Sequence, residues 1–249
     1  MKIIHLSDPH IYTKLLFDID PVSRFESALT HIINNHLDSS LFVITGDLTH
    51  FGDKESYEKL KEILNKSNLP ISLHPKLMIG NHDDRETFKK NFTDISCDLN
   101  GFVQYFIDKN NKRYIFLDTN LAGTDQGHLC KKRQSWLINC LKDNDENKEI
   151  YIFMHHNPLG LGHANTDKIG LQQKDEFKSV LNQYRKSIKH IFFGHQHITT
   201  SGDYLGIPFS SPRSTWSPLI PNFTKEYILG TANTDPNYNI ILIRDDSLV

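Results

Sequence analysis

Residues 41–47 read Leu41-Phe42-Val43-Ile44-Thr45-Gly46-Asp47, an apolar run that ends in a glycine and a carboxylate. A run of this kind predicts a buried strand, and the glycine suits the tight turn that follows it. Further apolar runs predict strands at residues 2–7, 76–79, 103–108, 113–117, 149–154, 190–193 and 239–244. The chain is therefore expected to be organised around β-sheets.

Segments with apolar residues at helical spacing lie between these strands. They predict helices at residues 22–36, 54–65, 132–141 and 174–184, with a further helix near residues 85–91. Alternating strands and helices indicate an α/β layered fold. After residue 200, short strands and turns predict a small β meander that continues a sheet. Because no repeat, low-complexity tract or Pro/Gly-rich linker interrupts the sequence, we expect residues 1–249 to form a single domain.

The composition is that of a protein with a packed core, and its histidine content is high. Hydrophobic residues make up 38% of the 249 residues and charged residues 23%, which excludes an intrinsically disordered chain. The 28 Lys and Arg nearly balance the 30 Asp and Glu, giving a net charge of −2, so charge offers no argument for a nucleic-acid partner. Fourteen His beside 3 Cys favour metal chemistry or proton transfer.

We read no signal for export or membrane anchoring in the sequence. The apolar start is broken by His5 and Asp8, too early for a signal peptide, and no run approaches the roughly 18 apolar residues of a membrane span. Cys97, Cys130 and Cys140 lack the C-x-x-C spacing of zinc or redox sites. We therefore expect a cytoplasmic protein with three reduced thiols and no membrane partner.

Polar clusters follow five of the predicted strands. They read Ser7-Asp8-Pro9-His10, Gly46-Asp47, Gly80-Asn81-His82-Asp83, His155-His156 and Gly194-His195-Gln196-His197. In α/β sheets, ligands bind in the crevice outside the carboxyl ends of the strands. We therefore expect the five clusters to converge at one edge and to form the functional site.

Three of these clusters have an ordinary structural interpretation when taken singly. Asp8 and His10 lie two residues apart and can face one cation, but they also fit a capping residue and a surface histidine. Asp47 can bridge two ions or cap a helix. Asn81 offers an amide oxygen with His82 aimed at a substrate, although this stretch also fits an Asn-type turn before a helix.

The two histidine clusters differ in spacing. His155 and His156 are adjacent, and adjacent strand residues face opposite sides, so only one of them is expected to bind a cation. His195 and His197 are two apart, so both imidazoles can reach one site. The clusters together offer oxygen and nitrogen ligands without sulfur. Such ligands suit Mn, Fe, Zn or Co, and their number suits a two-metal site with Asp47 shared.

In this order and at these intervals, the motifs D-x-H, G-D, G-N-H-D, H-H and G-H-x-H resemble those of the calcineurin-like metallophosphoesterase superfamily. Within it, residues 154–158, 162–171 and 201–215 are similar to class III bacterial cyclic-nucleotide phosphodiesterases and to their glycerophosphodiesterase relatives. The motifs run from Asp8 to His197, most of the chain. The resemblance implies a four-layer αββα sandwich, in which two mixed β-sheets are flanked by helices.

The resemblance also implies a role for each site residue. One metal would be held by Asp8, His10, Asp47 and His197, and a second by Asp47, Asn81, His155 and His195. His82 matches the histidine beside the phosphate, which stabilises the transition state or donates a proton. The residues expected to bind substrate are His10, Asp47, Asn81, His82 and His197. Two positions depart from the pattern, His50 for an acidic or Asn residue and Asn157 for the first Pro of H-H-P-P.

The implied activity is hydrolysis of a small phosphodiester by a hydroxide that bridges two divalent metal ions. The leading substrate is a 3′,5′-cyclic nucleotide such as cAMP, and the enzymatic alternative is a glycerophosphodiester or another small diester at the same site. A non-catalytic scaffold of the same fold and a nuclease are further alternatives, but the net charge offers no DNA-binding surface for a nuclease.

Specificity is expected to come from residues 163–171 and 211–216. Arg213, Thr215 and Trp216 are candidate contacts to a base or an alcohol, although Trp216 fits a packing role equally well. Relatives frequently form dimers, so we expect this protein to form a homodimer.

Overall fold

The computed structural model describes residues 1–144, 148–221, 223, 230–232 and 234–249. Its strands are β1 (Lys2–Leu6), β2 (Leu41–Thr45), β3 (Lys76–Met78), β4 (Tyr105–Lys109), β5 (Lys112–Leu117), β6 (Glu149–Met154), β7 (Ile188–Phe192), β8 (Thr200–Tyr204), β9 (Ile207–Ser211) and β10 (Asn239–Leu242). Its helices are α1 (Pro21–Asn35), α2 (Lys54–Lys66), α3 (Arg85–Asn91), α4 (Lys131–Lys142), α5 (Thr166–Ile169) and α6 (Lys174–Tyr184), with a 3₁₀ turn at Ile71–Leu73. The predicted alternation of strands and helices is confirmed.

The strands form two mixed sheets. The first has the order β10-β1-β2-β3, with β1, β2 and β3 parallel and β10 antiparallel to β1. The second has the order β4-β5-β6-β7-β9-β8, in which the four inner strands are parallel and both edge strands are antiparallel to their neighbours. The meander predicted after residue 200 is the β8–β9 hairpin at one edge of this sheet.

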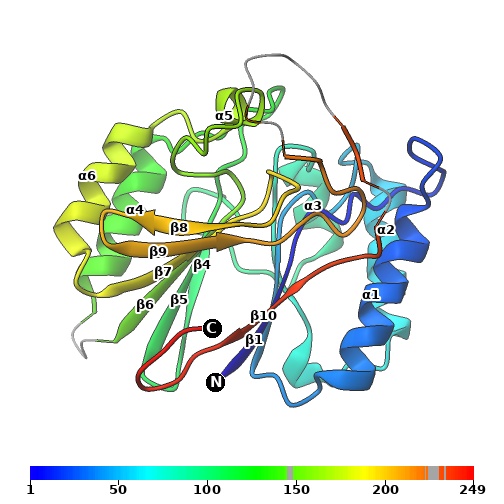
Figure 1. Ribbon diagram of the computed structural model, residues 1–249, viewed down its shortest axis with the longest axis horizontal. Helices are drawn as coiled ribbons and strands as arrows, with labels where there is room; N and C mark the ends of the chain where they lie inside the picture. The colour runs from blue at the N-terminus through cyan, green and yellow to red at the C-terminus, as the bar shows by residue number, and fades with distance from the viewer. Residues whose placement is uncertain (145–147, 222, 224–229, 233) are drawn as a thin grey trace.

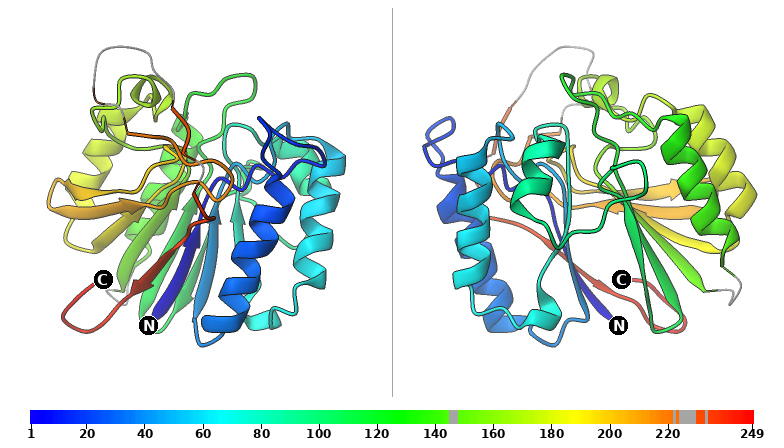
Figure 2. Two further views of the ribbon diagram at one scale, coloured as in Figure 1. Left: turned by 45° about the vertical axis from the view of Figure 1, so that its right-hand side comes forward. Right: turned by 180° about the vertical axis from the view of Figure 1, so that it is seen from behind.

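Three apolar clusters separate four layers of structure (Figures 1 and 2). One, which includes Phe25, lies between the four-stranded sheet and the helices α1, α2 and α3. A second, which includes Phe153, lies between the two sheets. A third, which includes Phe177, lies between the six-stranded sheet and the helices α4 and α6. The predicted αββα sandwich of two mixed sheets flanked by helices is confirmed.

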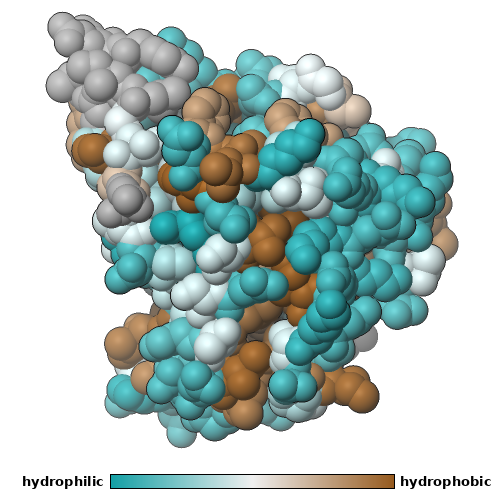
Figure 3. All heavy atoms as spheres, turned by 90° about the vertical axis from the view of Figure 1, so that its right-hand side faces the viewer, coloured by the Kyte–Doolittle hydropathy of each residue, from teal (hydrophilic) through white to brown (hydrophobic). Residues whose placement is uncertain are grey.

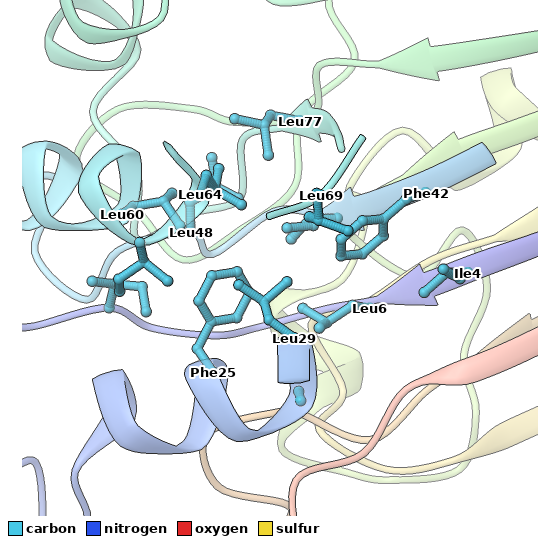
Figure 4. Close-up of a cluster of buried hydrophobic side chains, with 14 of the residues drawn as sticks. Ile4, Leu6, Phe25, Leu29, Phe42, Leu48, Leu60, Leu64, Leu69 and Leu77 are labelled. Atoms are coloured by element: carbon cyan, nitrogen blue, oxygen red, sulfur yellow. The ribbon is translucent and has the colours of Figure 1, made fainter. Parts of the chain in front are cut away.

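Helix α1 shows how the sequence produces this layering. Phe25, Leu29 and Ile32 recur at helical spacing and are buried, and Figure 4 shows Phe25 and Leu29 pointing toward side chains of β1, β2 and α2. Asp20 caps the helix because its carboxylate accepts from the amides of Val22 and Ser23. The surface on the side of α1 and α2 is mostly hydrophilic (Figure 3).

Several observed strand ends differ from the predicted ones by one or two residues. The sequence predicts a strand from residue 103, but β4 begins at Tyr105, because the amide of Val103 donates to the Asp118 carboxylate at 2.9 Å. Strand β7 begins two residues earlier than expected, at Ile188. None of the helices within the described residues is long and apolar enough to cross a membrane.

The carboxyl ends of strands from both sheets meet at one end of the molecule, the upper part of Figure 1. Within each sheet a backbone hydrogen bond ties neighbouring ends together, from the Asp8 amide to the Gly46 carbonyl at 3.2 Å and from the Gly194 amide to the His155 carbonyl at 3.0 Å. Between the sheets, the His195 amide donates to the Asp8 carboxylate at 3.1 Å. The loops that carry the predicted polar clusters therefore lie side by side, at the junction of the two sheets.

Candidate metal centre

Four of the predicted ligands form one compact group at this junction. Ligand atoms of Asp8, His10, Asp47 and His197 all lie within 4.8 Å of one another. His10 Nε2 is 3.1 Å from His197 Nε2 and 3.5 Å from Asp47 Oδ2, and His197 Nε2 is 3.5 Å from Asp8 Oδ1. These are the residues that the family resemblance assigned to one metal, and the fold brings them together across 187 positions of sequence.

The other predicted ligands lie against the opposite oxygen of Asp47. His155 Nε2 is 3.3 Å from Asp47 Oδ1 and 3.0 Å from Asn81 Oδ1. The ring centroid of His195 is 5.0 Å from that of His155. Asp47 thus directs one oxygen toward His10 and the other toward His155, the arrangement needed for a carboxylate shared by two ions.

His82 lies at the edge of the first group. Its backbone amide donates to Asp47 Oδ1 at 2.9 Å, and its Nδ1 donates to the carbonyl oxygen of His50 at 2.8 Å. Its ring is 4.7 Å from the ring of His10 and is only half-buried. The predicted position of His82, beside the ligands and open to a substrate, agrees with this geometry.

His156 also lies close to the site, although only one of the two adjacent histidines is expected to bind a cation. Its ring lies 4.7 Å from that of His195, and one nitrogen of each of His155, His156 and His195 lies within 4.8 Å of the others. Strand β6 ends at Met154, so the alternation of side chains along a strand does not extend to these two residues. The Nδ1 atom of His156 is engaged with the Thr119 hydroxyl at 2.7 Å.

The carboxylates and imidazoles of the site stabilise one another's charged forms. Burial works against ionisation of Asp47, but His155 and the neighbouring histidines hold its pKa well below the usual value. Burial likewise disfavours the charged form of His155, yet the Asp47 carboxylate raises the pKa of this imidazole to about 9. The pKa of Asp8 is lowered in spite of its burial, because His197 lies beside it. Two carboxylates therefore stay ionised in a buried site, where they attract positive charge.

For two other histidines of the site, burial is the main effect on the pKa. It lowers the pKa of His195 to about 3, with the positive charge of His155 adding to the effect. It also lowers the pKa of His10 well below the usual value. A neutral imidazole keeps a lone pair, which is the state in which histidine binds a metal.

The donor set fits divalent cations. In His155 and His197, Nδ1 donates to a backbone carbonyl oxygen, at 2.7 Å and 2.8 Å, which leaves Nε2 as the ligand atom. Metal-binding histidines are usually oriented in this way. Among the described residues, buried His195 Nε2 has no hydrogen-bond partner. A cation at the site would satisfy this orphaned nitrogen, which otherwise carries a desolvation cost.

The backbone of the site is held in an unusual conformation. The φ angles of Asp8, His10, Asp47, His195 and His197 are 54°, 45°, 46°, 66° and 53°. L residues rarely adopt this left-handed region, since each such residue costs on the order of 1–3 kcal/mol and persists only where the surrounding structure imposes it. Such outliers gather at functional sites.

Glycines of the motifs allow the loops to approach one another. A Cβ on Gly80 would lie 2.2 Å from Asp47 Oδ1 and 2.5 Å from the Asp47 backbone nitrogen. A Cβ on Gly194 would lie 1.9 Å from the hydroxyl oxygen of Ser7. The glycines before Asn81 and His195 are therefore required by close packing against the ligand loops.

Asp83, to which the sequence analysis gave no role, fastens two ligand loops together. Its Oδ2 accepts from the amides of Gly80 and Leu48 at 2.9 Å and 3.0 Å. Its Oδ1 accepts from the Thr49 amide at 3.1 Å and from the Tyr57 hydroxyl at 2.9 Å. In the sequence, Asp83 is marked only by its place at the end of Gly80-Asn81-His82-Asp83. Apart from Gly80, its hydrogen-bond donors lie far away along the chain.

A second buried network explains the departure at Asn157. Its side-chain oxygen accepts from Gln196 Nε2 at 2.6 Å, and Thr166 donates to the side-chain oxygen of Gln196. Gln196 stands between the predicted ligands His195 and His197. Asn157 and Gln196 therefore link the ligand histidines to α5, which the sequence pattern did not reveal.

A cavity of about 710 Å³ opens above the cluster. It is lined by Phe17, Asp47, His50, Asn81, His82, Asp125, Asn165, Thr166, Lys168, Ile169, His195, His197, Trp216, Ser217, Leu219 and Thr231. The predicted specificity segment 163–171 thus contributes to the cavity wall.

The three candidate substrate contacts near the end of the chain have different positions. Trp216 lines this cavity, whereas Arg213 lines a separate cavity of about 390 Å³. Thr215 is fully buried, its amide donates to the Ser7 carbonyl at 3.1 Å, and it is not among the residues that line the main cavity. Arg213 and Thr215 therefore do not line the main cavity, because the backbone of Thr215 is held by the loop that follows β1.

The sequence and the fold match those of known proteins. A model of the calcineurin-like phosphoesterase family matches residues 1–199. A probable cyclic nucleotide phosphodiesterase of Rhodopseudomonas palustris is 30% identical over 253 residues, covering 100% of this chain and 90% of the relative. Glycerophosphodiester phosphodiesterase GpdQ of Enterobacter lignolyticus is 30% identical over 210 residues, covering 82% and 73%. A dimetal phosphatase from Danio rerio shares the fold with a TM-score of 0.73 at 12% identity, covering 99% and 94% of the two chains.

Proposed function

The chain belongs to the calcineurin-like phosphoesterase family, and we propose that it is a dinuclear-metal phosphodiesterase whose leading substrate is a 3′,5′-cyclic nucleotide such as cAMP. The family and the hydrolase class predicted from the motifs are confirmed by the family match and by relatives named phosphodiesterases. The observation that carries the proposal is Asp47, whose two oxygens face two separate groups of ligand atoms at the floor of one cavity.

Asp8, His10, Asp47 and His197 would hold one divalent ion, and Asp47, Asn81, His155 and His195 a second. Bound there, such ions supply Lewis-acid stabilisation of a phosphate and an activated water. The absence of sulfur among these ligands favours Mn, Fe, Zn or Co. The number and identity of the metals are part of the proposal.

His82 is the residue proposed to act on the substrate itself. The His50 carbonyl accepts from Nδ1, which fixes the orientation of the ring and leaves Nε2 as the atom that can meet the phosphodiester. In its charged form, this imidazole stabilises the phosphate oxygens or gives a proton to the departing alkoxide, an effect typically worth about 10²–10⁴-fold in rate. Asp47, Asn81 and His197 line the same cavity and His10 lies directly behind His197, so these four residues would contribute to substrate binding.

The names of the relatives support both proposed substrates. A relative from Pseudomonas aeruginosa is named 3′,5′-cyclic adenosine monophosphate phosphodiesterase CpdA and is 23% identical over 198 residues. The similarity to GpdQ supports the alternative, a glycerophosphodiester hydrolase. A non-catalytic scaffold would tolerate loss of ligands, whereas all seven predicted metal ligands and His82 are present here. The net charge of −2 gives no support to a nuclease.

A substrate panel combined with metal analysis tests the proposal. The purified protein with Mn²⁺ is assayed against cAMP, bis(p-nitrophenyl) phosphate and glycerophosphocholine, and the metal content of the same sample is measured. Turnover of cAMP with about two ions per chain supports the leading proposal. Turnover of glycerophosphocholine without cAMP supports the alternative, and absence of turnover with any metal favours the scaffold.

Three broader proposals accompany this function. We propose that residues 1–249 act as a single domain, that the protein works in the cytoplasm, and that its assembly is a homodimer. Limited proteolysis, cell fractionation and light scattering of the purified protein test these proposals separately. A stable monomer at micromolar concentration would contradict the homodimer.

A further inference from the structure

We propose that Phe17 determines substrate specificity by providing the ring on which a planar aromatic group, such as a nucleobase, stacks at the mouth of the cavity. The inference rests on the proposed function and deepens it, since it concerns the part of the substrate remote from the phosphate. The observations that support it are the exposure of Phe17, its backbone conformation and its place beside Trp216.

Phe17 lines the cavity although most of its side chain is open to solvent. It is 82% exposed, and it shares the cavity wall with Asp47 and His197. Leu15, in the same loop, is 62% exposed but is not among the residues that line this cavity. An exposed hydrophobic side chain is ordinary by itself. Phe17 differs from an ordinary exposed hydrophobic residue because it also lines the cavity that contains predicted metal ligands.

The backbone holds Phe17 at the tip of a tight turn. Leu16 and Ile19 exchange two backbone hydrogen bonds of 2.9 Å and 3.0 Å, and both central residues have positive φ, 50° for Phe17 and 63° for Asp18. Turns of this geometry ordinarily carry Asn, Asp or Gly at the central positions. A bulky aromatic residue with positive φ is an outlier. Because the exposed ring gains little packing in return, the outlier points to a functional role.

The turn is anchored on both sides, so the ring is presented in a defined place. Leu16 is buried, with 7% of its surface exposed, and Asp20 caps helix α1 directly after the turn. In Figures 1 and 2 the turn belongs to the dark-blue loop that extends outward between β1 and α1. The loop that carries Phe17 is therefore ordered before binding, so a ligand group that stacks on the ring costs less entropy of loop ordering.

Trp216 connects Phe17 to the ligand cluster but is itself covered. Its ring centroid lies 6.1 Å from that of Phe17, 4.9 Å from that of His10 and 5.5 Å from that of His50. Only 7% of Trp216 is exposed. The sequence offered Trp216 as a candidate for stacking on a base, but Phe17 has the exposed ring that stacking needs. Trp216 lies between Phe17 and the predicted metal ligand His10.

This geometry separates the two substrate classes by their chemistry. In a cyclic nucleotide the base projects from the ribose away from the phosphate, so a phosphate at the ligand cluster leaves the base free to reach the cavity mouth. The glycerol groups of glycerophosphoglycerol have neither an aromatic face nor a positive charge, whereas the choline of glycerophosphocholine can bind an aromatic ring through a cation–π contact. A stacking ring at position 17 therefore stabilises binding of the nucleotide without affecting glycerophosphoglycerol.

The test compares variants of Phe17 on both substrates with the Mn²⁺-loaded enzyme. Phe17→Ala and Phe17→Leu are expected to lower kcat/KM for cAMP about tenfold, within the range that base–aromatic stacking provides, mainly through KM. Phe17→Tyr keeps the ring and should retain the activity. The metal content of each variant reports on the metal site. Hydrolysis of glycerophosphoglycerol, which carries neither an aromatic group nor a positive charge, should show no change where the wild-type enzyme turns it over.

Phe51→Ala is the matched control. Phe51 is 60% exposed and its ring is 4.5 Å from that of His50, but it is not among the residues that line the cavity. Its removal should leave kcat/KM for cAMP unchanged. Ligand-observed NMR of AMP with the Zn²⁺-loaded protein provides a measurement that does not depend on turnover: saturation transfer to the base protons should fall for Phe17→Ala and persist for Phe51→Ala.

The outcomes separate this inference from the proposed function. If the wild-type enzyme hydrolyses cAMP and Phe17→Ala hydrolyses it equally well, the inference is wrong and the proposed function stands. An equal loss of activity on all diesters would assign Phe17 a structural role and would also overturn the inference. If the wild-type enzyme hydrolyses other diesters but no cyclic nucleotide, the proposed leading substrate is wrong. The NMR measurement then tests the ring by itself: loss of AMP binding in Phe17→Ala supports stacking, and unchanged binding overturns it.

Discussion

Replacement of Asp83 by alanine is expected to destabilise the protein far more than replacement of its neighbour. The Asp83 carboxylate is 5% exposed and accepts hydrogen bonds from three backbone amides, those of Gly80, Leu48 and Thr49. It also accepts from the hydroxyls of Thr49 and Tyr57. All the hydrogen-bond partners of this carboxylate are thus donors, and alanine offers none of them an acceptor.

The size of the effect follows from the number of donors left without a partner. A buried donor without an acceptor costs about 1–3 kcal/mol. Taking the lower part of that range for three amides, because water and backbone shifts relieve some of the cost, gives a loss of about 3–5 kcal/mol in the free energy of unfolding. This is a large share of the roughly 5–15 kcal/mol that stabilises a typical native protein.

Urea unfolding followed by circular dichroism measures this loss, with and without added Mn²⁺. Asp84→Ala is the matched control, because Asp84 caps α3 by accepting from the Thr87 amide at 2.7 Å, an exposed bond worth about 1 kcal/mol. Asp83→Asn should not restore stability, since its amide group would place N–H donors against the amides of Leu48 and Gly80.

The reasoning is refuted if Asp83→Ala and Asp84→Ala lose the same stability within error. It is also refuted if Asp83→Asn matches the wild-type protein, because the carboxylate would then not be needed as a double acceptor. Activity gives a further check: since Asp83 fastens the loop that carries Asn81 and His82, Asp83→Ala should lose phosphodiesterase activity under conditions in which it is still folded.

Four further outcomes are expected. Asp47→Ala should lose both metal ions and activity together in elemental analysis and assay, because one carboxylate faces both ligand groups; retention of either ion would contradict a shared ligand. His82→Ala should lower kcat by about 10²–10⁴-fold with nearly unchanged metal content, and loss of both ions would refute its role toward the substrate. Gly80→Ala should abolish metal binding, since its Cβ would lie 2.2 Å from Asp47 Oδ1, whereas Gly160→Ala, with 3.4 Å to its nearest neighbour, should bind metal normally. Treatment with EDTA should remove activity and lower the melting temperature, and Mn²⁺ should restore both; an unchanged melting temperature would argue against metal binding to the folded state.

The sequence was sufficient to predict the layers of the fold and the group of residues at the site. Short apolar runs such as Leu41–Thr45 carry the strand signal locally, and the polar residue after each run marks the strand end. Because parallel strands place these ends at one edge, Asp8, Asp47 and His155 could be predicted to converge. Periodicity thus accounts for the α/β layering and for the convergence of the polar clusters, whereas the four-layer sandwich and the assignment of ligands to two metals were implied by the resemblance to the family.

Other features of the site depend on contacts between residues far apart in the sequence. Asp83 accepts from Leu48, 35 positions away, and Gln196 donates to Asn157 across 39 positions. No local pattern indicates such pairs. The positive φ of Phe17 likewise cannot be read from its residue type, because Phe favours other conformations and the turn is imposed by its surroundings.

The candidate ligands are divided between the two sheets. Asp8, His10, Asp47 and Asn81 follow strands of the four-stranded sheet, whereas His155, His195 and His197 follow strands of the six-stranded sheet. A divalent ion bound by both sets would act as a cross-link between two layers that are otherwise joined mainly by apolar contacts. Metal affinity would then depend on how far one layer can slide over the other. A cavity-forming substitution at Phe153, deep in that interface, would weaken ion binding without altering any ligand.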